Sequence, residues 1–394
     1  MQIPNLSLEF GGSLKNVPVS YTTLGSLSPS KDNAIVICHA LSGSAEVGVW
    51  WRSLLEYGAG AALDPSKHFI ICMNCLGSPY GTASPLTDRD GDASLGPYGP
   101  DFPLTSIRDD VRLFRKVLDR LGVVRIQSVI GGSMGGMHVL EFAHFGTEYV
   151  KSIIPIATSA SYSAWGIGWG EMQRQCIYID PRFRDGRYSR NDPPKQGLAA
   201  ARMAAMLSYR SQKSFQTRFG RKVHDGAIET TAKESQLAPL AVQSYLQYQG
   251  TKFVDRFDAN CYIALTHKLD THDISRDRSP TVQDSLATIK QPALILSIET
   301  DVLFTIEEQL QLHRWIPNSI HRAIISDDGH DGFLLETDQI NRFIGSFLKR
   351  LDGNDPVDGT SPTGKSRGLL RSAWQSIATS ALWIVSNLNF RGGR

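Results

Sequence analysis

A serine in the middle of a glycine-rich turn constrains this chain more than any other feature. Residues 131–137 read Gly-Gly-Ser-Met-Gly-Gly-Met, after the apolar run 126–130 and before the helix-like run 138–145. A strand, a Gly-x-Ser-x-Gly turn and a helix in this order form a nucleophile elbow, which exposes the serine hydroxyl above a sheet edge. The same motif also occurs as an ordinary flexible turn. Ser133 is therefore a candidate nucleophile whose role depends on finding an acid and a histidine later in the chain.

Composition limits the classes of partner. The chain has 394 residues, a formal net charge of +2 and no long basic run, so nothing points to nucleic acid. The N-terminal residues show no secretory signal, and no apolar run reaches the length of a membrane span. The five cysteines are scattered and odd in number, which fits a reducing compartment. We expect a cytoplasmic protein without a membrane span.

Cys72 and Cys75 form a Cys-x-x-Cys pair at the end of an apolar run. Residues three apart on a strand face opposite sides, so the two thiols should diverge. No second Cys or His pair stands nearby to complete a zinc site. We expect a structural role for both cysteines and no metal site.

The rest of the chain alternates between strands and helices. Two short strands are expected at 6–10 and 17–21, joined by a turn at Gly11 and Gly12. The continuous apolar run at 34–38 is typical of a strand buried on both faces. Further strands are expected at 68–73, 126–130, 150–157, 292–297 and 321–325. Ser106 and Asp109 form a capping box for an amphipathic helix that Gly122 ends. This alternation predicts an α/β fold with a mostly parallel sheet covered by helices on both faces.

The rhythm of strands and helices divides the chain into three parts. Residues 1–157 and 288–351 carry the expected strands and form the predicted core. Residues 158–287 show helical patterns without a clear buried strand, so we expect a helical lid over the sheet edge. Residues 352–394 begin as a linker and continue as an apolar segment, whose expected roles are a docked helix, a partner contact or a helix on a membrane surface.

An acid and a histidine follow the last two expected strands. Asp301 comes after the strand at 292–297, and His330 comes after the strand at 321–325. The order Ser133, Asp301, His330 is that of α/β-hydrolases, so the sequence predicts this fold. His330 would take the proton of the Ser133 hydroxyl, and Asp301 would hold the imidazole in the useful tautomer.

The oxyanion hole is predicted from two backbone positions. The loop after an early central strand supplies one N–H group in this architecture, and the residue after the nucleophile supplies the other. Leu41 and Met134 occupy these positions. The alternative for the segment around Leu41 is an ordinary polar loop.

Several motifs together resemble the homoserine O-acetyltransferase family, and its fungal branch in particular. The elbow resembles the family's, and so do His-Ala-Leu-Ser-Gly at 39–43 and Leu-Gly-Ser-Pro-Tyr-Gly at 76–81. The segments 98–110, 257–262, 269–273 and 329–331 fit too, so the likeness covers about residues 5–350. The branch also includes a deacetylcephalosporin C acetyltransferase, so the resemblance leaves the acceptor open.

The resemblance implies a ping-pong reaction in which Ser133 takes an acetyl group from acetyl-CoA and passes it to a hydroxyl. It implies acetyl-CoA as co-substrate, no bound cofactor, small-molecule partners and a homodimer. In the family a lid arginine and a tyrosine seven residues later hold the amino-acid acceptor, and Arg202 and Tyr209 match them. Asp331 matches the acid that binds the amino group, and Ser42 is a further candidate for substrate binding. A guanidinium suits a carboxylate, and a carboxylate suits an ammonium.

The favoured acceptor is L-homoserine, which implies a role in methionine biosynthesis. Serine, a secondary-metabolite alcohol and water are the alternatives, and a non-catalytic binding protein is disfavoured by the triad. Two departures from the fungal pattern leave room for a specialised enzyme. The stretch after residues 219–221 is short, where many fungal relatives carry a long insertion, and the segment beyond Gly353 has no counterpart that we recognise.

Overall fold

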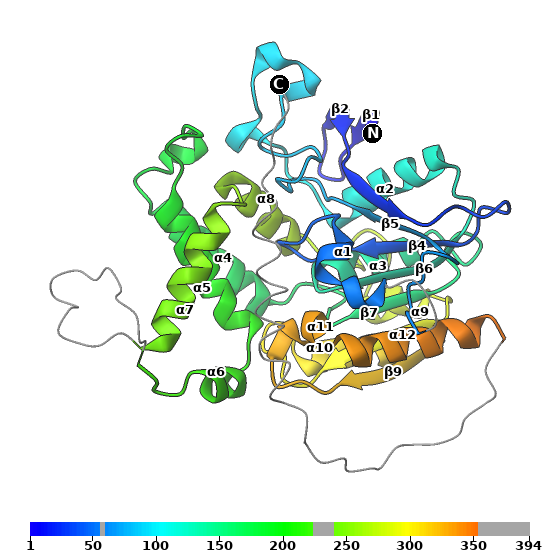
Figure 1. Cartoon of the computed structure of the whole chain (residues 1–394). Coiled ribbons are helices and arrows are strands. Elements are labelled where there is room, and N and C mark those ends of the chain that lie inside the picture. Colours follow the sequence, from blue (N-terminus) through cyan, green and yellow to red (C-terminus); the bar gives the residue numbers. More distant parts are fainter. Residues whose placement is uncertain (56–59, 224–239, 354–394) are drawn as a thin grey trace.

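A sheet of seven strands forms the centre of the molecule (Figure 1). The computed structural model describes residues 1–55, 60–223 and 240–353. The expected apolar segment beyond residue 353 lies outside these ranges. In spatial order the strands are β3 (Tyr21–Leu24), β5 (Phe69–Met73), β4 (Ala34–Cys38), β6 (Ile126–Gly132), β7 (Ile153–Ile156), β8 (Ala293–Ile298) and β9 (Ser319–Ile324). Only the pair β3–β5 is antiparallel, so the predicted α/β-hydrolase fold is confirmed.

The N-terminal hairpin begins earlier than expected. Its strands are β1 (Gln2–Ser7) and β2 (Ser13–Pro18), rather than 6–10 and 17–21. The turn does cross Gly11 and Gly12, which both have positive φ. In each strand the buried residues are three apart instead of alternating, so the apolar pattern did not indicate where the strands begin and end. The edge strand β3 was also missed because none of its residues is fully buried.

Helices cover both faces of the sheet because the central strands are apolar on both sides. In β4, Ala34, Val36 and Cys38 join one apolar cluster, and Ile35 and Ile37 join the other. The first cluster lies against α2 (Ile107–Leu121), α3 (Met134–Ala143) and α10 (Ile306–Trp315). The second lies against η1 (Arg52–Leu54), α11 (Gly332–Leu335) and α12 (Thr337–Leu351). Short helical segments complete the core: α1 (Val47–Trp50), η2 (Arg89–Gly91), η3 (Ala93–Leu95), η4 (Gly99–Asp101) and η7 (Gly329–Asp331).

Helix α2 begins and ends where the sequence predicted. The Ser106 hydroxyl accepts a hydrogen bond from the Asp109 N–H, and the Asp109 carboxylate accepts one from the Ser106 N–H. Gly122 ends the helix in the left-handed conformation. Cys72 and Cys75 also behave as expected, since both are buried free thiols in opposite apolar clusters.

The described part of residues 158–287 contains helices and no strand. They are α4 (Ala164–Tyr178), η5 (Arg184–Gly186), α5 (Lys195–Tyr209), α6 (Gln212–Arg218), α7 (Ala241–Val254), α8 (Ala259–Asp270) and α9 (Val282–Ala287). Figure 1 shows α4, α5 and α7 standing together to one side of the sheet, with α8 between them and the core. Helix α9 instead packs against α10. The proposed limits of the lid remain a prediction.

A fully buried ion pair joins the lid helix α8 to the core. Lys268 Nζ lies 2.6 Å from Asp110 Oδ2 on α2, and neither side chain is exposed. Lys268 also donates to the Leu76 carbonyl, and Asp110 accepts hydrogen bonds from the Leu76 N–H and from His138 Nε2. Every charge in this cluster therefore has a partner, as buried ions require.

None of the helices in residues 1–55, 60–223 and 240–353 combines the length and the apolar character that a membrane span needs.

Lys268→Met should lower the free energy of unfolding by about 3–5 kcal/mol, because it leaves the Asp110 carboxylate buried without its cation. Urea unfolding followed by circular dichroism measures this loss. The control is Lys67→Met, since the Lys67 side chain is 71% exposed and its ammonium lies 3.8 Å from Asp64. The control should cost at most about 1 kcal/mol. Equal losses in both variants would contradict a special role for the buried pair.

Candidate active site

Ser133 occupies a strained turn between β6 and α3. Its backbone has φ +60° and ψ −127°, a conformation that costs a non-glycine residue about 1–3 kcal/mol. The surroundings hold it there, because the Ser133 N–H donates to the Ile156 carbonyl at 3.0 Å and Thr158 Oγ1 donates to the Ser133 carbonyl at 2.8 Å. The predicted elbow is thus present as a strand, a tight turn and a helix.

Two glycines allow the close packing on which this turn depends. A Cβ on Gly135 would lie 2.1 Å from the Cys38 carbonyl oxygen, and one on Gly131 would lie 2.4 Å from the Gly135 carbonyl oxygen. Any side chain at either position would push α3 away from the end of β4. The glycines therefore bring the N-terminus of α3 next to the loop that carries Leu41.

The structure brings Asp301 and His330 together. Asp301 Oδ2 accepts a hydrogen bond of 2.6 Å from His330 Nδ1. Asp301 Oδ1 accepts from the N–H groups of Leu303 and Phe304, at 2.9 and 3.0 Å. Both residues are nearly buried, with 4% and 3% of their surface exposed. The carboxylate is fixed on both sides, so Nδ1 carries the proton and Nε2 is left as the basic nitrogen.

Gln309 was missed by the sequence analysis although it supports the acid. It is a buried glutamine on α10 whose Nε2 lies 3.3 Å from Asp301 Oδ2 and 2.6 Å from the Phe304 carbonyl oxygen. Its Oε1 accepts from the Ile298 N–H at 3.0 Å. A glutamine in a helical pattern reads as a solvent-facing residue, so only the three-dimensional packing identifies it.

Aromatic rings fix the plane of the His330 imidazole. It stacks on Phe304 with a centroid distance of 5.2 Å and an angle of 28°, and Tyr209 lies 6.1 Å away. Phe304 and Tyr209 line the same cavity as Ser133. Among the described residues the Ser133 hydroxyl makes no hydrogen bond. Catalytic hydrogen bonds are often loose before substrate binds, so this arrangement is compatible with a role as nucleophile.

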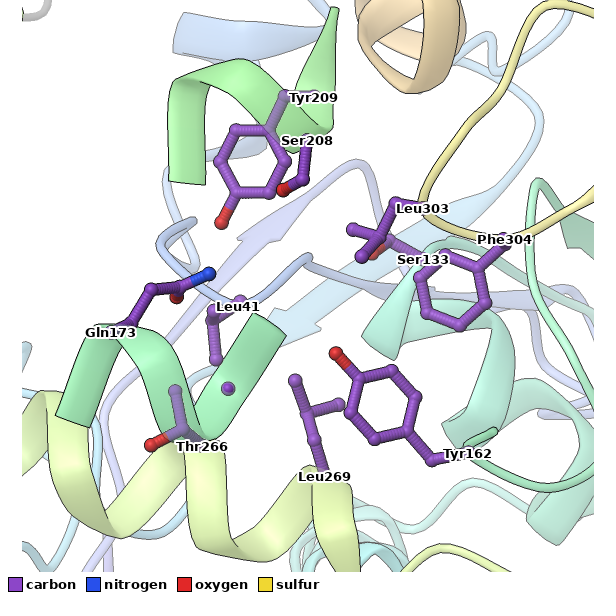
Figure 2. A pocket seen from close by; sticks show the side chains of 11 residues that line it. Leu41, Ser133, Tyr162, Gln173, Ser208, Tyr209, Thr266, Leu269, Leu303 and Phe304 are labelled. Atoms are coloured by element: carbon purple, nitrogen blue, oxygen red, sulfur yellow. The ribbon is translucent and has the colours of Figure 1, made fainter. Parts of the chain in front are cut away.

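The cavity at Ser133 is narrow and largely enclosed. Its volume is about 20 Å³, room for about one water molecule. Figure 2 shows the Tyr209 and Tyr162 hydroxyls directed into it from opposite sides, with Leu303 beside Ser133. Its walls come from both the core and the lid: Leu41, Ser133, Tyr162, Gly170, Gln173, Ser208, Tyr209, Thr266, Leu269, Leu303 and Phe304.

The two predicted oxyanion N–H groups are without a partner in the described part of the chain. Leu41 lines the cavity together with Ser133, and Met134 is the first residue of α3. Two unpaired N–H groups beside the nucleophile are what an oxyanion needs. The sequence-predicted pair is therefore compatible with the geometry.

His39 holds the loop that carries Leu41. Its Nδ1 lies 2.8 Å from the Ala40 carbonyl oxygen, and its Nε2 accepts a hydrogen bond from the Cys75 N–H at 3.4 Å. Burial lowers the pKa of His39 to about 4, partly offset by the hydrogen bond to Ala40. The imidazole is consequently neutral at pH 7, which suits a ring that donates on one side and accepts on the other.

One cluster outside the triad has the composition of a metal site. Ligand atoms of Cys75, Asp110 and His138 lie within 4.8 Å of one another, and all three residues are buried. However, Lys268 Nζ already lies 2.6 Å from Asp110 Oδ2. Burial also raises the pKa of the Cys75 thiol well above its usual value, so it remains protonated. The ammonium group occupies the place of a cation, and we assign no metal here.

The predicted acceptor-binding residues surround Ser42. Arg202 Nη1 lies 3.5 Å from Ser42 Oγ, and its guanidinium lies 5.4 Å from the centre of the Tyr209 ring. Arg256, which the sequence analysis did not consider, donates to the Ser42 carbonyl at 3.0 Å and to the Tyr80 hydroxyl at 2.6 Å. Neither arginine has an acidic partner among the described residues. The structure thus brings Arg202, Tyr209 and Ser42 together.

Asp331 already forms an ion pair with an arginine of the protein. Arg210 Nε lies 2.9 Å from Asp331 Oδ2, and Arg210 Nη1 lies 2.7 Å from Asp328 Oδ1. The charge of Asp331 still influences Tyr209, which lines the cavity. Burial raises the pKa of the Tyr209 hydroxyl, the positive charge of Arg202 opposes this rise, and the negative charge of Asp331 adds to it. An ammonium group at Asp331 would therefore share the carboxylate with Arg210.

Comparison with known proteins identifies the family. A family model described as alpha/beta hydrolase fold matches residues 33–337. Homoserine O-acetyltransferase FUB5 of Gibberella fujikuroi is 53% identical over 370 residues, which cover 88% of this chain and 86% of that protein. The chain belongs to the homoserine O-acetyltransferase family. It is consequently an acyltransferase of the α/β-hydrolase superfamily, as its motifs indicated.

Solved structures place the family among related acyl-transfer enzymes. The crystal structure of homoserine O-acetyltransferase from Staphylococcus aureus is 28% identical, with a TM-score of 0.70 over 88% of this chain and 94% of that one. The acetyl esterase MekB is 26% identical, with a TM-score of 0.76 over 89% of this chain and 96% of that one. The same fold therefore serves both transfer to an alcohol and transfer to water.

Stability should fall as the pH drops from about 6.5 toward 4, because unfolding lets the neutral, buried His39 take up a proton. With a folded pKa of about 4 and an ordinary unfolded value, this one group should cost about 2 kcal/mol between pH 7 and pH 5. His39→Gln should reduce that loss by this amount in urea titrations at the two pH values. The exposed His313→Gln variant is the control, and an unchanged pH dependence in His39→Gln would refute the assignment.

Proposed function

We propose that this protein transfers the acetyl group of acetyl-CoA to the hydroxyl of L-homoserine through an acetyl-serine at Ser133. Membership of the homoserine O-acetyltransferase family supports the acceptor. The observation that carries the mechanism is the 2.6 Å hydrogen bond between Asp301 and His330, which leaves His330 Nε2 as a base near the elbow. The reaction belongs to methionine biosynthesis, and we expect it in the cytoplasm.

The first half-reaction acetylates the enzyme. Ser133 Oγ attacks the thioester carbonyl carbon while His330 Nε2 takes its proton. The N–H groups of Leu41 and Met134 stabilise the negative oxygen of the tetrahedral intermediate, and the N-terminus of α3 adds to this field. The C–S bond then breaks, His330 returns the proton to sulfur, and CoA leaves. Asp301 stabilises the imidazolium in between.

The second half-reaction transfers the acetyl group to the acceptor. His330 takes the proton of the acceptor hydroxyl, whose oxygen attacks the acetyl-serine carbonyl carbon. The same two N–H groups bind the oxyanion, the ester bond to Ser133 breaks, and His330 returns the proton to Oγ. His330 Nε2 can serve as base and then as acid in both halves, because an imidazole nitrogen takes up and releases a proton in turn.

We propose that the acceptor is recognised through its carboxylate and its amino group. Arg202 lacks an acidic partner among the described residues, so it can pair with the carboxylate, with Ser42 and Tyr209 beside it. The amino group would approach Asp331, whose charge Arg210 partly satisfies. The family resemblance also leads us to expect a homodimer.

Water is the alternative acceptor, and the likeness to an acetyl esterase favours it. Serine or a secondary-metabolite alcohol remains the other alternative. The enclosed cavity at Ser133 favours transfer over hydrolysis, because little solvent can reach an acetyl-serine there.

Release of CoA from acetyl-CoA by the purified protein tests the proposal. L-homoserine should stimulate release strongly, L-serine and other alcohols should stimulate it less, and release without an acceptor should be slow. Ser133→Ala should abolish both turnover and the acetylated enzyme detected by mass spectrometry. Rapid release without an acceptor would make the protein a hydrolase, and an acetylated Ser133→Ala enzyme would refute the nucleophile.

Arg202→Ala should raise the KM for the acceptor by about 10- to 100-fold, since a charge-assisted pair of about 1.5–3 kcal/mol is lost. The KM for acetyl-CoA should change far less. Arg218→Ala removes an exposed lid arginine that contacts Phe219 and Tyr245, and it serves as the matched control. Equal effects on both substrates would indicate a structural role for Arg202.

A further inference from the structure

A second cavity, much larger than the one at Ser133, lies between the lid and the core. Its volume is about 440 Å³, and we call it the outer groove. Three segments distant in sequence form it: the loop after β5, the start of α5 with the residues before it, and the turn between α7 and α8. Its lining residues include Pro79, Leu86, Arg190, Lys195, Arg256 and Phe257. Nothing in the mechanism above uses this space.

The outer groove carries positive charge that the protein itself does not neutralise. Arg190, Lys195 and Arg256 line it, and none of them has an acidic partner within the described ranges. Arg190 donates only to the Leu86 carbonyl, at 3.3 Å. The acidic lining residues are Asp255, which is exposed, and Asp258. The Asp258 carboxylate is already engaged by the Tyr188 hydroxyl at 2.7 Å and the Cys261 N–H at 3.0 Å.

Neighbouring basic residues of the same segment are paired, which makes the free ones distinctive. Arg182 lies 2.8 Å and Arg184 3.1 Å from Asp192, and Arg187 lies 2.9 Å from Asp101. None of these three lines the outer groove. In this segment, the arginines outside the outer groove form ion pairs with aspartates, whereas Arg190 and Lys195, which line the groove, do not pair with any acid of the described part of the chain.

The start of α5 also lines the outer groove. Lys195 is its first residue and no acidic residue lies in its first turn. The buried Asp180 carboxylate accepts a hydrogen bond from the Gly197 N–H of this turn at 2.8 Å, so the helix N-terminus is partly satisfied. Pro194 and Lys195 both line the outer groove. The unpaired cations of Arg190, Lys195 and Arg256 are therefore the groups that favour anions such as phosphates here. Apolar walls at Pro79, Leu86 and Phe257 suit a flat ring between them.

Arg256 connects the outer groove to the active site. It lines the groove, and its Nη1 reaches the Ser42 carbonyl at 3.0 Å. Ser42 follows Leu41, which lines the cavity at Ser133. One arginine and one loop therefore separate a basic groove from the nucleophile, an arrangement suited to a ligand with a reactive end, a long neutral arm and a polyanionic end.

We propose that the outer groove binds the phosphorylated adenosine end of the acetyl donor, with Arg190 and Lys195 facing its phosphates. This inference rests on the proposed use of acetyl-CoA. The adenine ring lies against the apolar wall, and the arm passes Arg256 to place the thioester at Ser133. Arg190 and Lys195 then act on donor affinity and leave the bonds made and broken at Ser133 unchanged.

Calorimetry with adenosine 3′,5′-bisphosphate tests the site without any turnover. The wild-type protein should bind this fragment with a 1:1 stoichiometry and more weakly at high salt, as screening of exposed charges requires. The double variant Arg190→Gln/Lys195→Gln should lose about tenfold in affinity. Arg182→Gln removes one charge from the same segment outside the groove, and it should bind like the wild type. Equal loss in this control, or no binding by the wild type, would overturn the proposal.

Kinetics with two donors separates this inference from the proposed function. p-Nitrophenyl acetate acetylates a serine nucleophile but has no nucleotide. The ratio of kcat/KM for acetyl-CoA to that for p-nitrophenyl acetate should fall about tenfold in the double variant and stay at the wild-type value in Arg182→Gln. An unchanged ratio in the double variant would overturn the groove assignment. Fragment binding in a protein that does not use acetyl-CoA would leave the groove standing and remove the transferase function.

Discussion

The buried contact between Lys268 and Asp110 is the interaction on which the arrangement of the site depends. It fixes the lid helix α8 to α2, and through the Leu76 backbone and His138 it reaches the loop after β5 and the helix behind Ser133. Two buried charges tolerate little displacement, because each would lose its oppositely charged partner in a place that water does not reach. The lid residues that wall the cavity are thereby held in register with a nucleophile that belongs to the core.

The sequence predicted the structure correctly wherever one short stretch of chain determines the local conformation. The capping box at Ser106, the buried strand at 34–38 and the elbow at Ser133 were predictable because their signals lie within a few residues. The order of Ser133, Asp301 and His330 followed from the same strand counting, and the structure places Asp301 against His330. The predicted bounds of the N-terminal hairpin were wrong, because the buried residues of its strands are three apart and do not alternate.

The contacts that the sequence did not reveal depend on how side chains fold back on the backbone. Gln309 supports Asp301 from the helix that follows it, eight residues later, and Arg256 reaches Ser42 across more than two hundred residues. Neither residue has a sequence signature, since glutamine and arginine in helical patterns usually face solvent. The pairing of Asp331 with Arg210 is of the same kind. Family resemblance supplied Arg202 and Tyr209, which composition and spacing alone did not single out.

The volume beside Ser133 has a consequence for the fate of an acylated enzyme. A space that holds about one water molecule contains no chain of solvent molecules leading to the Ser133 hydroxyl. The acetyl group on Ser133 can be transferred to an alcohol or to water. Which transfer prevails then depends on which molecule reaches the carbonyl carbon, and not on the intrinsic nucleophilicity of the two. A single wall residue such as Leu303 or Tyr162, replaced by a smaller one, can shift that partition without altering the triad. Related enzymes that share this fold can therefore diverge between synthesis and degradation of esters through packing alone.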